Sequence, residues 1–358
     1  MNALKRKILT LIEAQGPLTL AQYMAIALSD PEHGYYMRRD PLGRDFITAP
    51  EISQVFGELI GLFFVQAWED RGRPSRFDLV ELGPGRGTLM ADMMRAAAKL
   101  RPQFAEAARI VLVETSPTLR GVQEATLASS QVNWVSRFED VPADAPLFLV
   151  ANEFFDALPI RQFVKSERGW HERMVASDGA SLCFMLTPDI APLSIIPQGL
   201  RDAPLGSVAE VNPGAAALMH SIAERIAEKG GVALIIDYGH AESASGDTFQ
   251  AVEDNAFADP LAEPGEADLT AHVDFGALAT AARDGGAYVP RIFPQGQFLD
   301  ALGIRVRANR LKRESPETSS EIDLAVDRLT NPQHMGTMFK TMATFEGQDR
   351  TTPPGFNA

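Results

Sequence analysis

The sequence contains a single cysteine, Cys183, among its 358 residues. One cysteine cannot form an internal disulfide, so a disulfide framework is excluded and a reducing compartment is expected. The six histidines are scattered without the paired spacing of metal ligands, and we therefore predict no metal site. Apolar runs fall well short of the roughly 18 residues of a membrane-spanning helix, so we expect no stable membrane insertion.

Positive charge is also scarce, since 33 Lys and Arg face 47 Asp and Glu and leave a net charge of −14. Contacts to a phosphate backbone need Lys and Arg, so we do not expect a nucleic acid as the main partner. The acidity is concentrated between Ala241 and Asp268, which hold eight acidic residues and no basic one. Such a segment is either a solvated loop or a surface that attracts a cationic substrate.

The most informative segment runs from Phe77 to Met90. A short apolar run ends near Glu81, glycines follow at 83, 85 and 87, and a helical pattern begins at Thr88. This is the pattern of a strand, a tight turn and a helix, which brings backbone close to a ligand at the end of a parallel strand.

Three ligand classes compete for this turn. A P-loop would close with Gly-Lys-Ser/Thr, but no lysine lies between Gly83 and Lys99. A dinucleotide site has Gly or Ala at the sixth position of its motif, where this chain has Thr88. The remaining pattern, Glu81 followed by Gly83, Gly85 and Gly87, resembles the first motif of class I methyltransferases, which bind S-adenosylmethionine (SAM). A carboxylate suits this ligand because SAM carries a sulfonium and an ammonium.

Further buried-strand patterns alternate with helices, at 109–114, 132–135, 147–152 and 232–238. We therefore predict an α/β, doubly wound, mainly parallel sheet, with ligands outside the carboxyl ends of its strands. Glu114 would then accept the ribose hydroxyls. Phe138, Glu139 and Asp140 follow the third strand, where an adenine pocket would form, and Asn152 ends the fourth.

The remaining segments are expected to surround this core. We predict an N-terminal helical cover over 1–75, a SAM-binding core over 76–156 and 206–345, an insertion after strand four over 157–205, and a flexible tail over 346–358. Within the cover, Thr48 is expected to cap one helix through Phe64, and the stretch from Thr48 to Ser53 to lie over the ligand. The last strands are predicted at 287–292 and 304–306.

Several separated motifs resemble, in matching order, the MidA-type SAM-dependent methyltransferases, the family of the mitochondrial complex I assembly-factor arginine methyltransferase. They are His33–Tyr36, Asp45–Ser53, Glu81–Thr88, Asn152–Pro159, Asp237–His240 and Asp268–Phe275. The resemblance implies a class I (Rossmann-like) fold, SAM as cofactor and methylation of a protein arginine, with a subunit of respiratory complex I as the mitochondrial substrate. It also implies a cytoplasmic location in a bacterium and the mitochondrial matrix in a eukaryote.

The segment Asn152-Glu153-Phe154-Phe155 stands where amine-directed methyltransferases carry Asn/Asp-Pro-Pro-Tyr/Phe. A guanidinium has a pKa above about 12, so carboxylates must hold it and take its proton as it attacks. Asn152, Glu153 and Asp156 are therefore the catalytic candidates. For Asp156 a helix-capping role is equally open, and the two phenylalanines either stack on the substrate or belong to the core.

Two other functions remain open on the sequence. One is a nucleotide-dependent oxidoreductase on the same fold, which Thr88 and the Asn-Glu-Phe-Phe segment disfavour. The other is a non-catalytic module for assembly or chaperoning that binds SAM as a structural ligand. Transfer of label from SAM to a protein would distinguish the enzyme from both.

Overall fold

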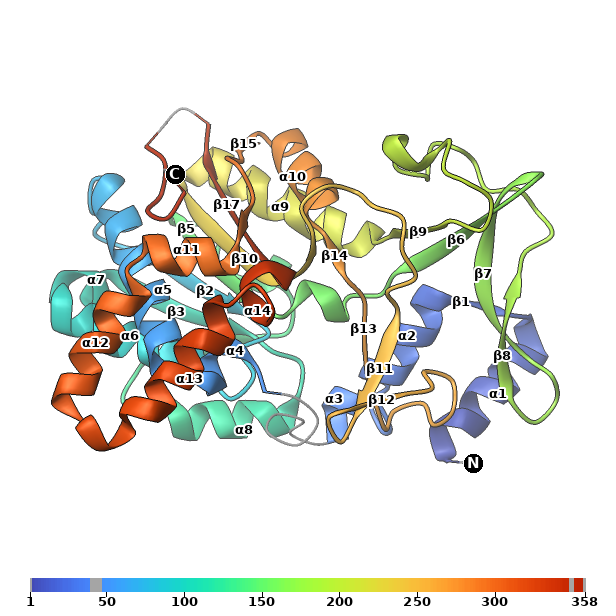
Figure 1. Cartoon of the computed structure of the whole chain (residues 1–358), viewed down its shortest axis with the longest axis horizontal. Helices are drawn as coiled ribbons and strands as arrows, with labels where there is room; N and C mark the ends of the chain where they lie inside the picture. Colours follow the sequence, from blue (N-terminus) through green and yellow to red (C-terminus); the bar gives the residue numbers. More distant parts are fainter. Residues whose placement is uncertain (1, 39–46, 348–350, 357–358) are drawn as a thin grey trace.

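The computed structural model describes residues 2–38, 47–347 and 351–356. Its centre is a nine-stranded sheet with the main order β15-β17-β10-β5-β2-β3-β4 (Figure 1). The strands β2 (Phe77–Leu82), β3 (Ala108–Val113), β4 (Val132–Val135), β5 (Leu147–Asn152) and β10 (Gly231–His240) pair in parallel. At one side β17 (Phe339–Glu346) runs antiparallel to β10 and pairs with β15 (Ala287–Tyr288) and β16 (Phe293–Pro294). The short strand β14 (Val273–Asp274) pairs in parallel with the end of β10.

Helices cover both faces of this sheet, so every residue of β2 and β5 is buried. One face packs against α5 (Gln54–Asp70), α6 (Thr88–Leu100), α7 (Pro102–Ala107) and α11 (Gln295–Ala301). The other face packs against α9 (Pro213–Lys229) and α10 (Phe275–Asp284). A strand buried on both faces is largely apolar, which is why β5 is an apolar run up to Asn152 and β2 is interrupted only by Asp78 and Glu81. The predicted doubly wound sheet is confirmed.

A second lobe lies beside the core on the right of Figure 1. Its five-stranded sheet contains β1 (Leu18–Thr19) from the N-terminal segment, which pairs with β7 (Gly169–Ser177). Strand β7 also pairs with β6 (Arg161–Ser166) and with β8 (Leu182–Leu186). Strand β6 pairs in turn with β9 (Val208–Val211). The helices α1 (Ala3–Gln15) and α2 (Leu20–Ser29) share an apolar cluster with a small sheet of β11 (Gln250–Glu253), β12 (Ala256–Ala258) and β13 (Asp268–Thr270). Segments far apart in the sequence thus share one core.

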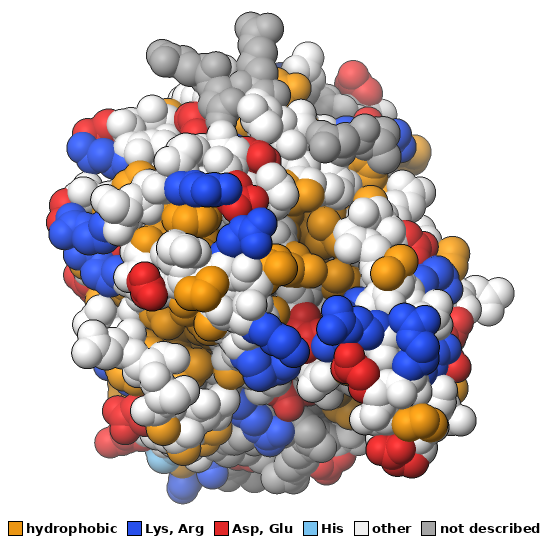
Figure 2. Space-filling view, turned by 90° about the vertical axis from the view of Figure 1, so that its left-hand side faces the viewer, with side chains coloured by type: hydrophobic (Ala, Val, Ile, Leu, Met, Phe, Trp, Pro, Cys, Tyr) orange, Lys and Arg blue, Asp and Glu red, His pale blue; other side chains and the backbone are white. Residues whose placement is uncertain are grey.

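The short and outer elements complete the fold. They are α3 (Tyr35–Arg38), α4 (Ala49–Ile52), α8 (Pro117–Thr126), α12 (Ile304–Glu314), α13 (Ser319–Thr330), α14 (Met335–Met338) and the 3-10 turns η1 (Phe138–Asp140), η2 (Phe155–Ala157), η3 (Gln198–Leu200) and η4 (Pro316–Thr318). Figure 2 shows the side of the molecule on the left of Figure 1, where basic and acidic side chains are interspersed. On α12, Arg307 pairs with the buried Glu58 of α5 at 2.7 Å and Lys312 with Asp323 of α13 at 2.6 Å. Within the described residues, no helix is long and apolar enough to cross a membrane.

Three local predictions are wrong. The helix expected from Thr48 through Phe64 breaks at Ser53, which is extended (φ −161°) and caps α5 by accepting from the Val55 amide at 3.2 Å. The segment predicted as a strand at 304–306 begins helix α12, because Gly303 takes a left-handed conformation and starts the helix. At 287–292 only Ala287–Tyr288 is a strand, and the last long strand is β17.

The predicted flexible tail is wrong at Phe356. Its side chain is buried in the apolar cluster, with ring centroids 5.2 Å from Phe298 and 5.6 Å from Phe293. An aromatic ring buries a large apolar area, so this residue anchors the end of the chain. Residues 348–350, 357 and 358 of the tail, and Asp45 and Phe46 of the second motif, lie outside the described residues.

Candidate functional site

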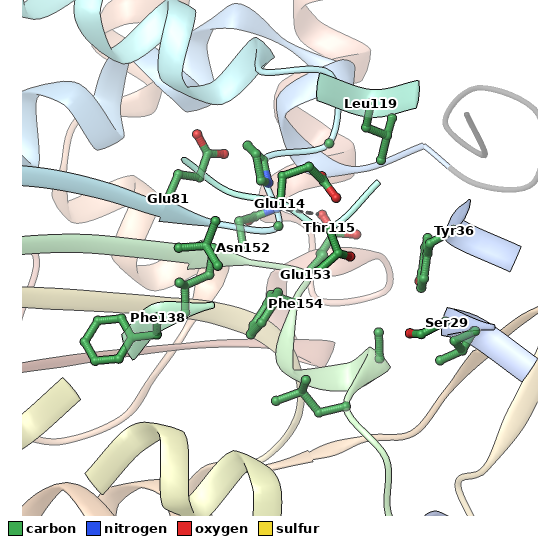
Figure 3. Close-up of a pocket in the computed structure, with 18 of the residues that line it drawn as sticks. Ser29, Tyr36, Glu81, Glu114, Thr115, Leu119, Phe138, Asn152, Glu153 and Phe154 are labelled. Carbon is green, nitrogen blue, oxygen red and sulfur yellow. Dashed lines mark hydrogen bonds between the residues drawn. The ribbon is translucent and has the colours of Figure 1, made fainter. Parts of the chain in front are cut away.

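A cavity of about 500 Å³ lies between the two lobes, outside the carboxyl ends of β2, β3 and β5 (Figure 3). The core contributes the glycine loop, Glu114 and the segment Asn152–Phe154 to its lining. The second lobe contributes Tyr36 of α3 and part of α2. This is the position at which open parallel sheets bind their ligands.

The glycine loop closes one side of the cavity. Gly83, Gly85 and Gly87 have φ values of 61°, 53° and 80°, a region that residues with a side chain rarely adopt. A Cβ at Gly83 would lie 2.8 Å from the ring of Phe154, so the close approach also requires glycine there. Gly83 and Gly85 line the cavity, whereas Gly87 stands at the N-terminus of α6 and does not.

Glu81 lies at the buried end of β2 and borders the cavity. Its Oε2 atom has no hydrogen-bond partner among the described residues, and burial raises the pKa of this carboxyl to about 8. A buried carboxyl oxygen without a partner is costly unless a ligand satisfies it. A cationic or N–H-bearing ligand would supply what is missing.

Glu114 follows β3 and is fixed from two directions. Its Oε1 accepts from the Ser116 amide at 2.7 Å, and its Oε2 accepts from Gln123 Nε2 at 3.1 Å. The same Gln123 nitrogen donates to the carbonyl of Gly85 at 2.7 Å, so Gln123 ties Glu114 to the glycine loop. Gln123 was not predicted from the sequence. It could have been found from its spacing, because a residue four positions after Leu119 lies on the same buried face of α8.

Of the three residues predicted to form the adenine pocket, only two line the cavity. Phe138 and Glu139 line the cavity, together with Leu119. Asp140 does not line it, and its half-exposed side chain pairs with Arg137 at 3.5 Å. A 3-10 turn over Phe138–Asp140 sends neighbouring side chains in different directions, which a three-residue motif cannot reveal.

The turn after β5 carries the strongest signs of a reactive centre. Glu153 has φ 51°, a strained backbone conformation for a residue with a side chain, of the kind that clusters at functional sites. Its Oε1 accepts from the Ala49 amide at 2.9 Å and from Asn152 Nδ2 at 3.0 Å. Glu153 Oε2 and the buried Asn152 Oδ1 have no hydrogen-bond partner among the described residues. Burial raises the pKa of Glu153 to about 7.

Asp237 of β10 holds this turn in place. One of its carboxylate oxygens accepts from the amides of Phe154, Phe155 and Asp156, at 3.1, 3.0 and 3.3 Å. Asp156 is buried beside Asp237, and burial raises its pKa to about 6. Asp156 does not line the cavity, so the structure does not bring it to the place expected for direct contact with a substrate. Phe155 is buried in the core, whereas Phe154 lines the cavity.

The cover residues Thr48 to Ser53 meet the cavity only in part. Thr48 and Glu51 line it, but Ser53 does not. Glu51 accepts from the hydroxyl of Thr88 at 2.5 Å and so joins α4 to the start of α6. None of the eight acidic residues between Ala241 and Asp268 lines the cavity, although Asp268 contacts Tyr36 behind its wall. No group of three or more metal-ligating side chains occurs in the described part of the chain.

Comparison with known proteins agrees with this geometry. A family model described as "Putative S-adenosyl-L-methionine-dependent methyltransferase" matches residues 59–292. Mouse mitochondrial protein arginine methyltransferase NDUFAF7 is 39% identical over 96% of this chain and 84% of its own length, and the human protein is 37% identical over 96% and 83%. This chain belongs to the SAM-dependent methyltransferase family. A Burkholderia thailandensis protein solved bound to S-adenosyl-homocysteine superposes with a TM-score of 0.82 at 27% identity, covering 99% of this chain and 93% of that one.

The residues of this methyltransferase fit SAM as its cofactor. The glycine loop leaves room for close backbone approach, and the unpartnered Oε2 atom of Glu81 matches a ligand with cationic and N–H groups. Each Glu114 oxygen accepts one hydrogen bond and retains capacity for another, as ribose hydroxyls require. The class I fold and the SAM-dependent enzyme class expected from the sequence are confirmed, and the oxidoreductase alternative is not supported.

Proposed function

We propose that this methyltransferase transfers methyl groups from SAM to an arginine side chain of a protein substrate. The observation that carries the proposal is the pair of acceptors without a hydrogen-bond partner at the end of β5, Glu153 Oε2 and the buried Asn152 Oδ1. A planar guanidinium presents several N–H donors in a fixed fork, which two adjacent acceptors can hold. The naming of the mouse and human relatives as protein arginine methyltransferases supports the same assignment.

Bound SAM supplies a methyl group activated by its sulfonium. Glu153 would hold one terminal nitrogen through Oε2 and accept its proton as that nitrogen becomes the nucleophile. Asn152 would orient the second nitrogen, since its amide group donates to Glu153 and therefore turns its oxygen away from that carboxylate. The strained backbone at Glu153 and the three amides on Asp237 fix this geometry before the substrate arrives.

Labelling with radioactive SAM tests the proposal. The purified protein is incubated with labelled SAM and a cell lysate, and the labelled band is hydrolysed to amino acids. We expect label in methylarginine for the wild type and little transfer by Glu153→Gln, which keeps the shape of the side chain but cannot take a proton. Equal SAM affinity in both proteins, measured by calorimetry, is the control. Label recovered in methyllysine, or full transfer by Glu153→Gln, would contradict the proposal.

The resemblance extends this proposal to a target and a compartment. We propose a subunit of respiratory complex I as the candidate target, with the enzyme in the cytoplasm of a bacterium or in the mitochondrial matrix of a eukaryote. The named relatives are mitochondrial proteins, which supports the second location for a eukaryotic chain. Methylarginine in purified complex I that disappears when the gene is deleted would support the target, and unchanged methylation would exclude it.

A further inference from the structure

The wall of the cavity opposite Glu153 has no role in the proposal above. It is formed by Tyr36 of α3 and by Ala25, Leu28 and Ser29 of α2. Figure 3 shows Tyr36 across the cavity from Glu153 and Phe154. Tyr36 is the one aromatic residue of these four, and a guanidinium stacks favourably on an aromatic ring.

The ring of Tyr36 is held rigidly from two directions. Its hydroxyl donates to Asp268 Oδ1 at 2.6 Å, and Asp268 is itself buried on β13. The ring of the fully buried Tyr35 packs against it edge-to-face, with centroids 5.1 Å apart at 74°. A wall that is already ordered loses little conformational entropy when a ligand binds, so it can contribute most of its contact energy to affinity.

The charges around Tyr36 favour a cation. Burial, reinforced by the carboxylates of Asp268 and Asp156, holds the pKa of the Tyr36 hydroxyl well above its usual value, so it remains a neutral donor. Both aspartates are buried, and neither lines the cavity. Negative charge beside the hydroxyl of an aromatic ring adds to the attraction that a cation on the ring face experiences.

We propose that Tyr36 is a specificity-determining residue, whose ring stacks on the target guanidinium while Asn152 and Glu153 hold the edge of that group. The inference rests on the proposed function, because it concerns the same substrate. A lysine ammonium has no plane that could stack on Tyr36 and no second nitrogen that could reach both acceptors. The ring on one wall and the two acceptors on the other therefore select arginine over lysine. It also gives the acidic segment a role through Asp268, behind the wall rather than at the entrance.

A binding experiment tests this inference without requiring turnover. The full chain, saturated with S-adenosyl-homocysteine, is titrated with Nα-acetyl-arginine amide and with Nα-acetyl-lysine amide, and binding is followed by NMR. We expect the wild type to bind the arginine probe more tightly, and Tyr36→Leu to lose roughly 3- to 30-fold of that affinity. Tyr36→Phe keeps the ring and should restore most of the preference. Tyr288→Leu, at a half-exposed tyrosine of β15, is the matched control.

The outcomes separate the two proposals. If the wild type prefers arginine and Tyr36→Leu keeps that preference, the role of Tyr36 is refuted and the proposed function stands. A loss of S-adenosyl-homocysteine affinity in Tyr36→Leu with unchanged probe preference also refutes it, because Tyr36 would then be a wall for the cofactor. A wild type that binds arginine no better than lysine contradicts both proposals. If Tyr36→Leu does not fold, Asp268→Asn decides: weaker arginine binding supports the inference, and unchanged binding refutes it.

Discussion

Replacing Glu153 by glutamine should stabilise the protein while removing its activity. Burial raises the pKa of Glu153 to about 7 from an ordinary value of 4.5. The folded protein therefore retains a proton that the unfolded chain releases, and wild-type stability falls as pH rises from about 4.5 through 7. The glutamine oxygen can still accept from Ala49 and Asn152, so the variant keeps these contacts without the buried charge.

The size of the expected gain in stability follows from the pKa shift of Glu153. A difference of 2–3 pKa units corresponds to about 3 kcal/mol, and relaxation around a partly exposed carboxylate lowers the expected gain to about 1–3 kcal/mol. Urea unfolding of the ligand-free wild type and variant, at pH values from 5 to 8, measures it. We expect the variant to be more stable at pH 8, with an advantage that shrinks toward pH 5. An advantage that does not change with pH would refute the argument.

Three further predictions concern the cofactor and the fold. Gly85→Val should abolish SAM binding, because a φ of 53° and the close approach of the backbone to the ligand both require glycine. Calorimetry measures the SAM affinity, and circular dichroism checks that the variant is folded. Retained affinity would remove this loop from the site. Glu114→Ala should weaken SAM by about 1.5–3 kcal/mol, the range for hydrogen bonds to a charged group, and unchanged affinity would mean that another residue accepts the ribose. Phe356→Ala should cost about 3–5 kcal/mol in urea unfolding because its ring is buried, with exposed Phe257→Ala as the neutral control. Equal stability of the two variants would show that the tail does not anchor the core.

Much of the core was predictable because its signals are local. The apolar runs at 147–152 and 232–238 are strands β5 and β10, and the alternate glycines form the loop that they predict. Strand β17 was missed because Lys340, Thr341 and Thr344 interrupt its apolar pattern. Its pairing with β10 joins segments about a hundred residues apart, which nothing local in the sequence reveals.

The site was predictable in its residue types but not in its contacts. Asn152, Glu153 and Glu114 meet at one cavity because parallel strands bring their carboxyl ends to one edge of the sheet. Other features of the site join distant segments and depend on how the lobes pack. These are the wall formed by Tyr36, the hydrogen bond between Glu51 and the helix after the glycine loop, and the hydrogen bond between Gln123 and the loop itself. Asp156 shows the limit of the motif, because the chain enters the 3-10 turn Phe155–Ala157 after Glu153 and the Asp156 side chain does not line the cavity.

The central claim is that a target arginine is held at the end of β5 beside SAM. A crystal structure with S-adenosyl-homocysteine and a peptide carrying the methylated arginine tests it most directly. We predict ribose hydroxyls on Glu114 and a guanidinium between Glu153 Oε2 and Asn152 Oδ1, with one nitrogen facing the cofactor sulfur. A cofactor outside this cavity, or an arginine bound away from both acceptors, would contradict the account.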